Sequence, residues 1–311
     1  MKKIFITFLG LFTLTIAVQA QKKTSGAIQF ETTIDPAAAM SASGMQISEE
    51  MRARMPKSVK ANFELLFTAT NASYMAVVET EDSNGSGGGG GMGRMMMRFG
   101  GGAGGAREYF YSFADQKLAE VFDVSDTTYV MQGKLAVANP PQMNMGAGQQ
   151  RQGAGNNANA PAPAQSAVQF LPGPPTLEVV KTDETKKILG FNCKKVIVKS
   201  IRKAKVLDMD KDIVDETAIW YTTDLGFNFS PNPNMWTEGT VLALENKGNS
   251  TLATSIEYRG VSNKDVTAPK KALPITQEEY QKKMDNMMNR MRGMGNNRGG
   301  NTGQARSIVI N

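Results

Sequence analysis

The chain has 311 residues, of which 41% are hydrophobic and 21% charged, and its formal net charge is +6. It contains no histidine and one cysteine, which excludes Ser–His and Cys–His nucleophiles and an internal disulfide. The lack of histidine also removes the commonest general base and the commonest metal ligand.

The first twenty residues predict a cleavable export signal. Two lysines precede an apolar run, and Val18 and Ala20 put small residues at the positions that a signal peptidase reads. No cysteine follows that run, so no lipid anchor is expected, and no later run reaches the ~18 apolar residues of a spanning helix. We expect residues 1–20 to be removed, leaving a mature chain that is periplasmic or secreted.

Most of the mature chain alternates apolar and polar residues, which is typical of β-strands. Residues 26–34 begin the pattern, and residues 62–81 predict a hairpin that turns at Asn71-Ala72. Similar patterns follow at residues 107–113, 118–124, 127–137, 177–181, 191–200, 217–223, 239–246 and 251–261. About ten strands joined by short turns predict a mainly β fold, a large antiparallel sheet or half-barrel with one or two helices against it.

Two segments carry helix signals. Ser48 caps the first, and Pro56 limits its opening part to about two turns. In the second, Thr276 and Glu279 form a capping box and a glycine marks the end. We expect residues 276–292 to form an amphipathic helix lying across the sheet, with an apolar stripe made of Tyr280, Met284, Met287, Met288 and Met291.

Low-complexity composition separates the foldable parts of the chain. Residues 83–107 are rich in glycine and methionine, residues 139–170 in asparagine, proline, alanine and glutamine, and residues 293–311 in glycine and asparagine. We expect all three to be disordered, and residues 21–275 to form one β-rich domain around the first two. The basic C-terminal part has one aromatic residue and no motif for reading bases, so no nucleic-acid partner is expected.

The glycine-rich run at residues 85–106 admits three interpretations. A phosphate loop is excluded, because the glycines are consecutive and a strand follows instead of a helix. A Cu(I) site made of thioether ligands remains open as an alternative function, with ligands Met92, Met95, Met96 and Met97. A tether between two strands is favoured, because polyglycine loses much entropy when it becomes ordered. No cofactor is expected.

An acidic run at residues 207–217 predicts a charged turn that leads into a strand. Asp208, Asp210 and Asp212 alternate as at the start of a calcium loop, but isoleucine stands at two positions where that loop needs glycine and glutamate. A pair of carboxylates for hydrolysis has no signature in sequence, so a carboxylate-dependent hydrolase stays open as a second alternative.

One region resembles a known family. An Ile-x-Gly-aromatic turn precedes a lysine-rich strand, and a Trp-Tyr-Thr strand and an aspartate follow, here Ile188, Gly190, Phe191, Lys194, Lys195, Trp220, Tyr221, Thr222 and Asp224. Over residues 188–258 these features resemble the GLPGLI family, exported proteins of Bacteroidetes-type bacteria that are mostly of unknown function. The naming motif is degenerate, since Trp236-Thr237-Glu238 stand in place of Gly-Leu-Pro and only Gly239 and the apolar run after it remain.

The resemblance implies an exported envelope protein and supplies no catalytic residue. The pattern of sheet and helix also resembles the half-barrels of periplasmic lipoprotein carriers, a likeness of fold that does not establish cargo.

The candidate contacts with a ligand or partner are five aromatic residues: Trp220, Tyr221, Phe227, Phe229 and Trp236. Trp220 and Tyr221 point to opposite faces of one strand, so we expect one to enter the core and the other to line a surface. The other three lie on a loop with two prolines and either pin it to the sheet, which is favoured, or face a ligand. We expect a non-enzymatic envelope protein that binds an apolar ligand or a protein partner.

Overall fold

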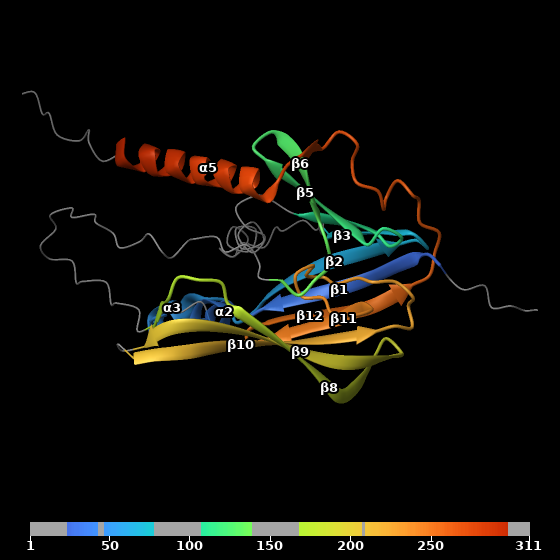
Figure 1. The fold of residues 1–311 in the computed structure, drawn as a ribbon, viewed down its shortest axis with the longest axis horizontal. Coiled ribbons are helices and arrows are strands. Elements are labelled where there is room, and N and C mark those ends of the chain that lie inside the picture. Colours follow the sequence, from blue (N-terminus) through green and yellow to red (C-terminus); the bar gives the residue numbers. More distant parts are fainter. Residues whose placement is uncertain (1–23, 43–46, 78–106, 139–167, 207–208, 298–311) are drawn as a thin grey trace, which may run out of the picture.

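The computed structural model describes residues 24–42, 47–77, 107–138, 168–206 and 209–297. In these ranges thirteen strands form one open, curved sheet, accompanied by three helices (Figure 1). The prediction of a mainly β fold built on a large sheet or half-barrel is therefore confirmed. No helix in the same ranges has both the length and the apolar character needed to cross a membrane.

The sheet is antiparallel apart from one short contact at its edge. The elements are β1 (Gly26–Ile34), α2 (Pro36–Ala42), α3 (Glu49–Arg54), β2 (Val59–Phe67), β3 (Asn71–Ala76), β4 (Glu108–Ser112), β5 (Lys117–Val124), β6 (Thr127–Gly133), β7 (Val168–Phe170), β8 (Thr176–Ile188), β9 (Phe191–Val206), β10 (Met209–Thr222), β11 (Thr240–Asn246), β12 (Asn249–Glu257), β13 (Leu273–Pro274) and α5 (Gln277–Asn297). Their order across the sheet is β13-β6-β5-β4-β3-β2-β1-β12-β11-β10-β9-β7, and β8 also pairs with β9. Only β13 runs parallel to its neighbour, β6.

One face of the sheet carries most of the core. Residues that pair across antiparallel strands share a face, so Ile28, Leu65 and Tyr74 lie together. On the next two strands, Tyr111 of β4 pairs with Leu118 of β5, and both lie on the same face. All five side chains are buried in a single cluster. We call this face the inner face.

The acidic run is a strand and not the predicted turn. It forms the first half of β10, where Asp210 lies opposite Lys205 and Asp212 lies opposite Lys203. Opposite charges that face each other across a ladder stabilise the pairing, and this offsets the low strand propensity of aspartate. Asp208 lies outside the described residues.

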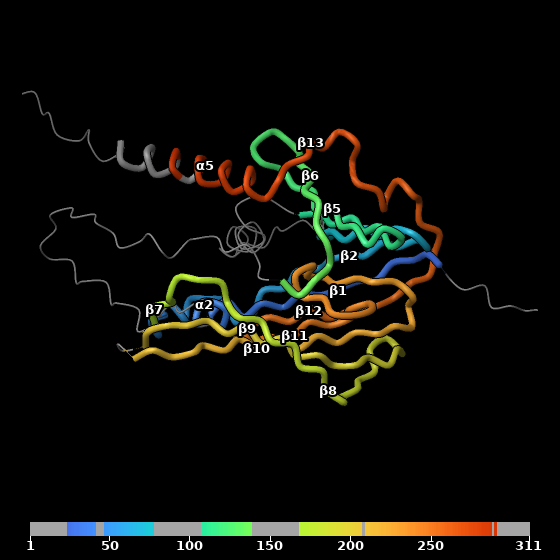
Figure 2. Tube along the Cα trace, viewed as in Figure 1, coloured from blue at the N-terminus to red at the C-terminus, as the bar shows by residue number. Residues whose placement is uncertain are grey.

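Part of a segment that we expected to be disordered is also a strand. Val168–Phe170 forms β7 and pairs with the end of β9 (Figure 2). The ring of Phe170 lies beneath the guanidinium of Arg202, with 4.0 Å between the guanidinium carbon and the ring centre. Residues 139–167 lie outside the described residues, so the prediction of disorder there remains untested.

Two predicted boundaries are confirmed and one shifts. The N–H of Met51 donates to Ser48 Oγ over 3.2 Å, so α3 begins at its predicted cap, and it ends at Arg54. The sequence Lys247-Gly248-Asn249 also predicts a turn between two strands, and Lys247 and Gly248 do join β11 to β12. The first hairpin turns at residues 68–70 and not at 71–72, because Thr68 Oγ1 accepts the N–H of Asn71 over 3.1 Å.

Helix α5 begins as predicted but is longer, and it does not lie across the sheet. The N–H of Glu279 donates to Thr276 Oγ1 over 3.2 Å, and the N–H of Thr276 donates to Glu279 Oε2 over 2.9 Å. Among its described side chains, those that pack against β5 and β6 come from the first turns: Tyr280, Met284 and Met287. The helix then projects beyond these strands and runs to Asn297 (Figure 1). It continues past position 292 because a glycine inside a helix costs only about 1 kcal/mol. The side chains of Met288 and Met291 lie outside the described residues.

Candidate functional site

The loop between β10 and β11 covers the inner face. Phe229 of this loop is fully buried, and its ring centre lies 5.6 Å from that of Phe30, 5.3 Å from Tyr74 and 5.2 Å from Tyr111. The Tyr111 hydroxyl donates to the Ser230 carbonyl oxygen over 3.0 Å. Phe229 therefore pins the loop to the sheet, and its ring is enclosed by the chain itself.

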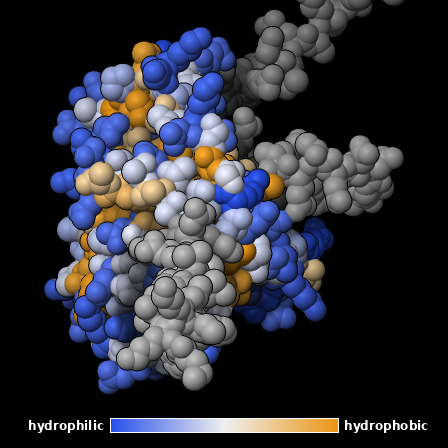
Figure 3. Space-filling model, turned by 90° about the vertical axis from the view of Figure 1, so that its right-hand side faces the viewer, coloured by the Kyte–Doolittle hydropathy of each residue, from blue (hydrophilic) through white to orange (hydrophobic). Residues whose placement is uncertain are grey.

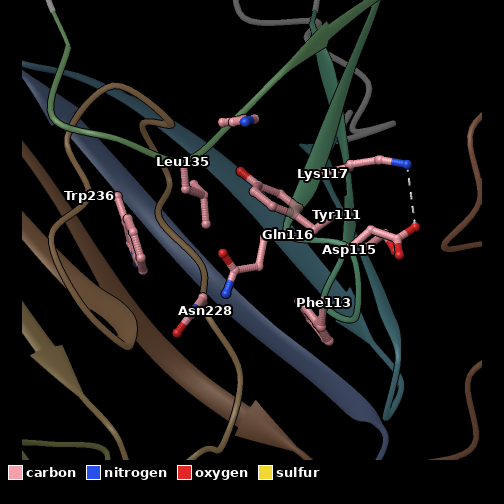
Figure 4. Close-up of a pocket in the computed structure, with 10 residues that line it drawn as sticks. Tyr111, Phe113, Asp115, Gln116, Lys117, Leu135, Asn228 and Trp236 are labelled. Atoms are coloured by element: carbon pink, nitrogen blue, oxygen red, sulfur yellow. Dashed lines mark ion pairs between the residues drawn. The ribbon is translucent and has the colours of Figure 1, made fainter.

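Phe227 and Trp236 lie at the margins of this covered region. Phe227 stacks on Phe113 with 4.9 Å between ring centres and lies 5.1 Å from Phe67. The indole N–H of Trp236 donates to the Gly239 carbonyl oxygen over 2.9 Å. Trp236 also lines a small cavity of about 140 Å³ beside the β4–β5 turn (Figure 4).

Tyr221 enters the core from β10. Its neighbours in a buried cluster are Val196, Ile219 and Val241 on the inner face. The Tyr221 hydroxyl donates to Glu238 Oε2 over 3.0 Å, and burial, followed by this hydrogen bond, raises the pKa of the phenol.

Trp220 lies on the opposite face of the sheet, but its ring is not exposed to solvent. Lys186 and Lys195 place their ammonium nitrogens 5.2 and 5.5 Å from the centre of its ring, and the indole N–H donates to Glu245 over 3.2 Å. Only 6% of Trp220 is exposed. We expected one of Trp220 and Tyr221 to line a surface, and this is wrong. Trp220 faces away from the core side of β10, but two lysine side chains cover its indole ring.

A short segment after β6 holds the covering loop in place. Ala136 N–H donates to the Pro233 carbonyl oxygen over 3.1 Å, and Ala138 N–H donates to that of Asn234 over 3.1 Å. The backbone N–H of Trp236 donates to the Ala136 carbonyl oxygen over 3.3 Å. These bonds fix the position of the loop above β5 and β6, where it forms one wall of a larger cavity.

That larger cavity is a groove of about 600 Å³ between β6, the covering loop and the start of α5. We call it the β6–α5 groove. Its apolar lining consists of Leu118, Val130, Met131, Pro233, Pro274 and Ile275. Its polar lining includes Arg107, Tyr109, Glu120, Gln132, Lys134 and Glu279. Beyond the groove, hydrophobic side chains reach the surface at scattered places between hydrophilic ones (Figure 3).

A largely buried ion pair forms the floor of the groove. Arg107 Nη1 donates to Glu120 Oε1, and each of these two side chains is 14% exposed. Arg107 Nη2 donates to the Tyr280 hydroxyl over 3.0 Å, and the guanidinium carbon lies 5.4 Å from the ring centres of both Phe122 and Tyr280. Arg107 Nε is buried and has no hydrogen-bond partner among the described residues.

Burial changes the proton affinity of this cluster. It raises the pKa of the Glu120 carboxyl, although the charge and hydrogen bond of Arg107 lower it. It also raises the pKa of the Tyr109 hydroxyl to about 12, with a further increase from Glu120 and a partial offset from Arg107. The groove therefore presents a buried guanidinium with one unused donor beside a carboxyl group that resists ionisation.

The remaining charged groups of the groove differ in how far they are already paired. Glu279 accepts from the N–H and the hydroxyl of Thr276. Lys134 is exposed and forms no ion pair among the described residues. The cationic side chains of the groove thus retain Arg107 Nε and the Lys134 ammonium without partners, whereas both carboxylates have partners.

The sequence prediction missed the groove. Arg107 was placed at the boundary between the disordered segment 83–107 and the strand 107–113, and no site role was given to Arg107, Tyr109 or Glu120. A signal was present, since Arg107, Tyr109 and Tyr111 alternate along one strand, and a tight turn to the next strand puts Glu120 opposite Tyr109. The predicted copper ligands, Met92, Met95, Met96 and Met97, lie outside the described residues.

No group of three or more Cys, Asp or Glu side chains within the described ranges is arranged to hold a metal ion.

Comparisons with known proteins identify no family for this chain. No protein-family model matches it, and no curated protein matches it. Among solved structures, PNGF-II in space group C2 is similar with a TM-score of 0.44 and 11% identity over 84% of this chain, and in space group P21 with 0.41 and 11% over 83%. The matches cover 32% and 33% of the PNGF-II chain, so this protein spans about a third of that length. Similarity at this level carries no argument about function.

Proposed function

We propose that this chain is a non-catalytic binding protein whose β6–α5 groove holds a ligand with an apolar body and an acidic group. The observation that carries the proposal is that two cationic side chains, Arg107 and Lys134, line a groove of about 600 Å³ whose other walls are largely apolar. That volume lies within the range of roughly 300–1,000 Å³ of pockets that bind small ligands.

An acidic group suits the groove because of its unpaired charges. A carboxylate would be attracted to these two cations, and hydrogen bonds between charged groups are about twice as strong as neutral ones. Lys134 lines the same groove and would add a second cation near the rim. The carboxylates of Glu120 and Glu279 are already held by Arg107 and Thr276, so they repel an incoming acid less than free carboxylates would.

An apolar body suits the walls. Leu118 and Met131 of the sheet, Pro233 of the covering loop, and Pro274 and Ile275 before α5 all line the groove. Burying apolar ligand surface against such walls contributes about 25 cal/mol per Å², which is the main source of affinity for a ligand of this kind.

The site of action is proposed to be the cell envelope. The support is the basic start, apolar run and small residues of positions 1–20, together with the resemblance of residues 188–258 to exported GLPGLI proteins. Expression with the native N-terminus, followed by cell fractionation and N-terminal sequencing, tests it. Processing before Gln21 is expected, and an unprocessed protein in the cytosol would refute export.

Two probes test the binding function. We expect isothermal titration to detect binding of laurate or of an acetylated, amidated octapeptide of alternating threonine and valine with one aspartate. Lys134→Met should weaken that binding by about tenfold, as expected for a lost charge-assisted contact, while the control Lys187→Met on β8 should leave it unchanged. Failure of both probes to bind, or equal binding by the Lys134→Met variant, would refute the proposal.

A carboxylate-dependent hydrolase is the second candidate, and one observation favours it. Glu120 and Glu279 line the same groove, and their pKa values shift in opposite directions, raised by burial for Glu120 and lowered by hydrogen bonds from Thr276 for Glu279. An acid and a base kept apart in this way are what hydrolysis requires. Turnover of a glycoside or ester panel that is abolished by Glu279→Gln would establish this function in place of the first.

A further inference from the structure

The outer edge of β6 is only partly covered. β13 contributes two residues, and these pair with Tyr129 and Val130. The N–H of Ile275 then donates to the Val130 carbonyl oxygen over 3.0 Å, after which the chain turns away into α5. From Met131 onward, no described strand pairs with this edge of β6.

The strand register shows which backbone groups of β6 have no strand partner at this edge. Val130 directs its carbonyl outward to Ile275, so in the antiparallel ladder with β5 the outward-facing residues are Val130 and then Gln132. Both backbone groups of Gln132 therefore point away from β5 and into the β6–α5 groove, which Gln132 lines. Outward N–H and C=O groups on an edge strand are a template for another strand.

The inner side of this edge has room for a side chain. Gly133 is the last residue of β6, and a carbon placed at its missing Cβ would meet only Leu118 Cδ2, at 3.6 Å. Met131 precedes it on the inner face, opposite Glu120 of the Arg107 ion pair. A residue added beside Met131 or Gly133 would thus direct its side chain over the inner face, where Arg107 and Glu120 form the floor of the groove.

We propose that the ligand of the β6–α5 groove is an extended peptide that adds to β6 at Gln132, in line with β13, and carries an acidic side chain for Arg107 and Lys134. This inference rests on the proposed binding function and specifies its ligand. Backbone hydrogen bonds at the sheet edge supply affinity in this mode, and pockets for alternate side chains supply specificity. The prolines at 233 and 274 and Ile275 form the apolar surface for the remaining side chains.

The unpaired backbone groups distinguish a peptide from an apolar acid. A fatty acid could place its carboxylate near Lys134 and Arg107, but its hydrocarbon chain would cover the N–H and C=O of Gln132 without bonding to them. Covering polar backbone groups without bonding to them is costly, whereas a peptide bonds to both. Charge complementarity also favours an acidic peptide, because the Lys134 ammonium has no ion-pair partner among the described residues and the Arg107 guanidinium lines the same groove.

A proline substitution isolates the backbone contact. In the full chain, Gln132→Pro removes one outward N–H and no ladder bond to β5, whereas Gln132→Ala removes the side chain and keeps the N–H. With the aspartate octapeptide as probe, we expect Gln132→Pro to weaken binding at least about tenfold and Gln132→Ala to change it less than about twofold. Replacing the aspartate of the probe by asparagine should also weaken binding about tenfold.

The outcomes separate this inference from the proposed function. Laurate binding without octapeptide binding, or octapeptide binding that Gln132→Pro leaves unchanged, would overturn the peptide inference and leave the binding function standing. Failure of both probes would overturn both. If thermal melting shows that Gln132→Pro does not fold, N-methylation of alternate amides of the octapeptide replaces it. Unchanged affinity of every methylated probe would then overturn the inference.

Discussion

Phe229 of the β10–β11 loop and Phe30 of β1 lie with their ring centres 5.6 Å apart, so a loop residue forms the middle of the core. In a half-barrel that carries cargo, the concave face offers space to an apolar ligand. Here Phe229 and Phe227 occupy the inner face and contact the aromatic residues of five other segments of the chain. A ligand is therefore better placed in the β6–α5 groove than under the covering loop.

Replacing Phe229 should cost the protein much of its stability. Phe229→Ala removes a fully buried ring and leaves a cavity, for which we expect a loss of about 3–5 kcal/mol in the free energy of unfolding. Phe227→Ala is the matched comparison. Because Phe227 is only partly buried, its replacement should reduce the free energy of unfolding less. Urea denaturation of both variants measures the difference. Equal losses would mean that the loop is not anchored chiefly through Phe229.

The single thiol should be unreactive in the folded protein. Cys193 is fully buried, and burial raises the pKa of its thiol to about 11. At about pH 8 a thiol with that pKa is roughly one-thousandth ionised, and only the thiolate attacks alkylating reagents. We expect iodoacetamide to label Cys193 slowly in buffer and fast in urea, as followed by mass spectrometry. Rapid labelling of the native protein would show that the start of β9 opens readily.

The order of elements could be predicted from the sequence because the signals are local. Alternation of apolar and polar residues marked the strands, and the Thr276–Glu279 capping box marked the start of α5. One error occurred where the pairing with a neighbouring strand decides the structure. In sequence, Asp210 and Asp212 predict a turn. In the structure they lie opposite Lys205 and Lys203 of the neighbouring strand, and the opposite charges favour a strand.

The site was harder to predict than the fold, for a physical reason. The groove joins residues from β4, β5, β6, the covering loop and the start of α5, and no local pattern brings these together. For Trp220 the error was a predicted site that is not accessible. From sequence, an aromatic residue on the outer face of a strand is expected to be exposed and free to contact a ligand. Lys186 and Lys195, which lie over its ring, come from two other strands.

The pH dependence of stability should reveal Glu120. Because burial raises the pKa of this carboxyl in the folded state, the folded protein binds its proton more tightly than the unfolded chain does. Its contribution to stability is then complete below the unfolded pKa of about 4.3, and it is lost as the pH rises through the folded pKa. We expect the stability of the wild type relative to Glu120→Gln to fall as the pH rises above that value and then to level off.

Urea unfolding of both proteins between about pH 4 and pH 8 measures this difference. The pKa of Glu108 is also raised, by burial and then by Asp123, but that effect is present in both proteins and cancels. A difference that grows with pH would mean that Arg107 outweighs burial and keeps Glu120 ionised.

The glycine–methionine run at residues 85–106 should be dispensable for folding if it is a tether. β3 and β4 pair directly, and deletion of the run leaves residues 77–84 and 107 to connect them. Loop-closure cost varies with the logarithm of length, so we expect the free energy of unfolding to change by less than about 1 kcal/mol, and in the stabilising direction. The copper hypothesis predicts instead that Cu(I) raises the melting temperature of the wild type under reducing conditions, because a ligand that binds only the folded state stabilises it. Melting curves of the wild type and the deletion variant with and without Cu(I) decide between the two. A Cu(I)-dependent rise that disappears when Met92, Met95, Met96 and Met97 are replaced by leucine would contradict the tether and make this run a metal site.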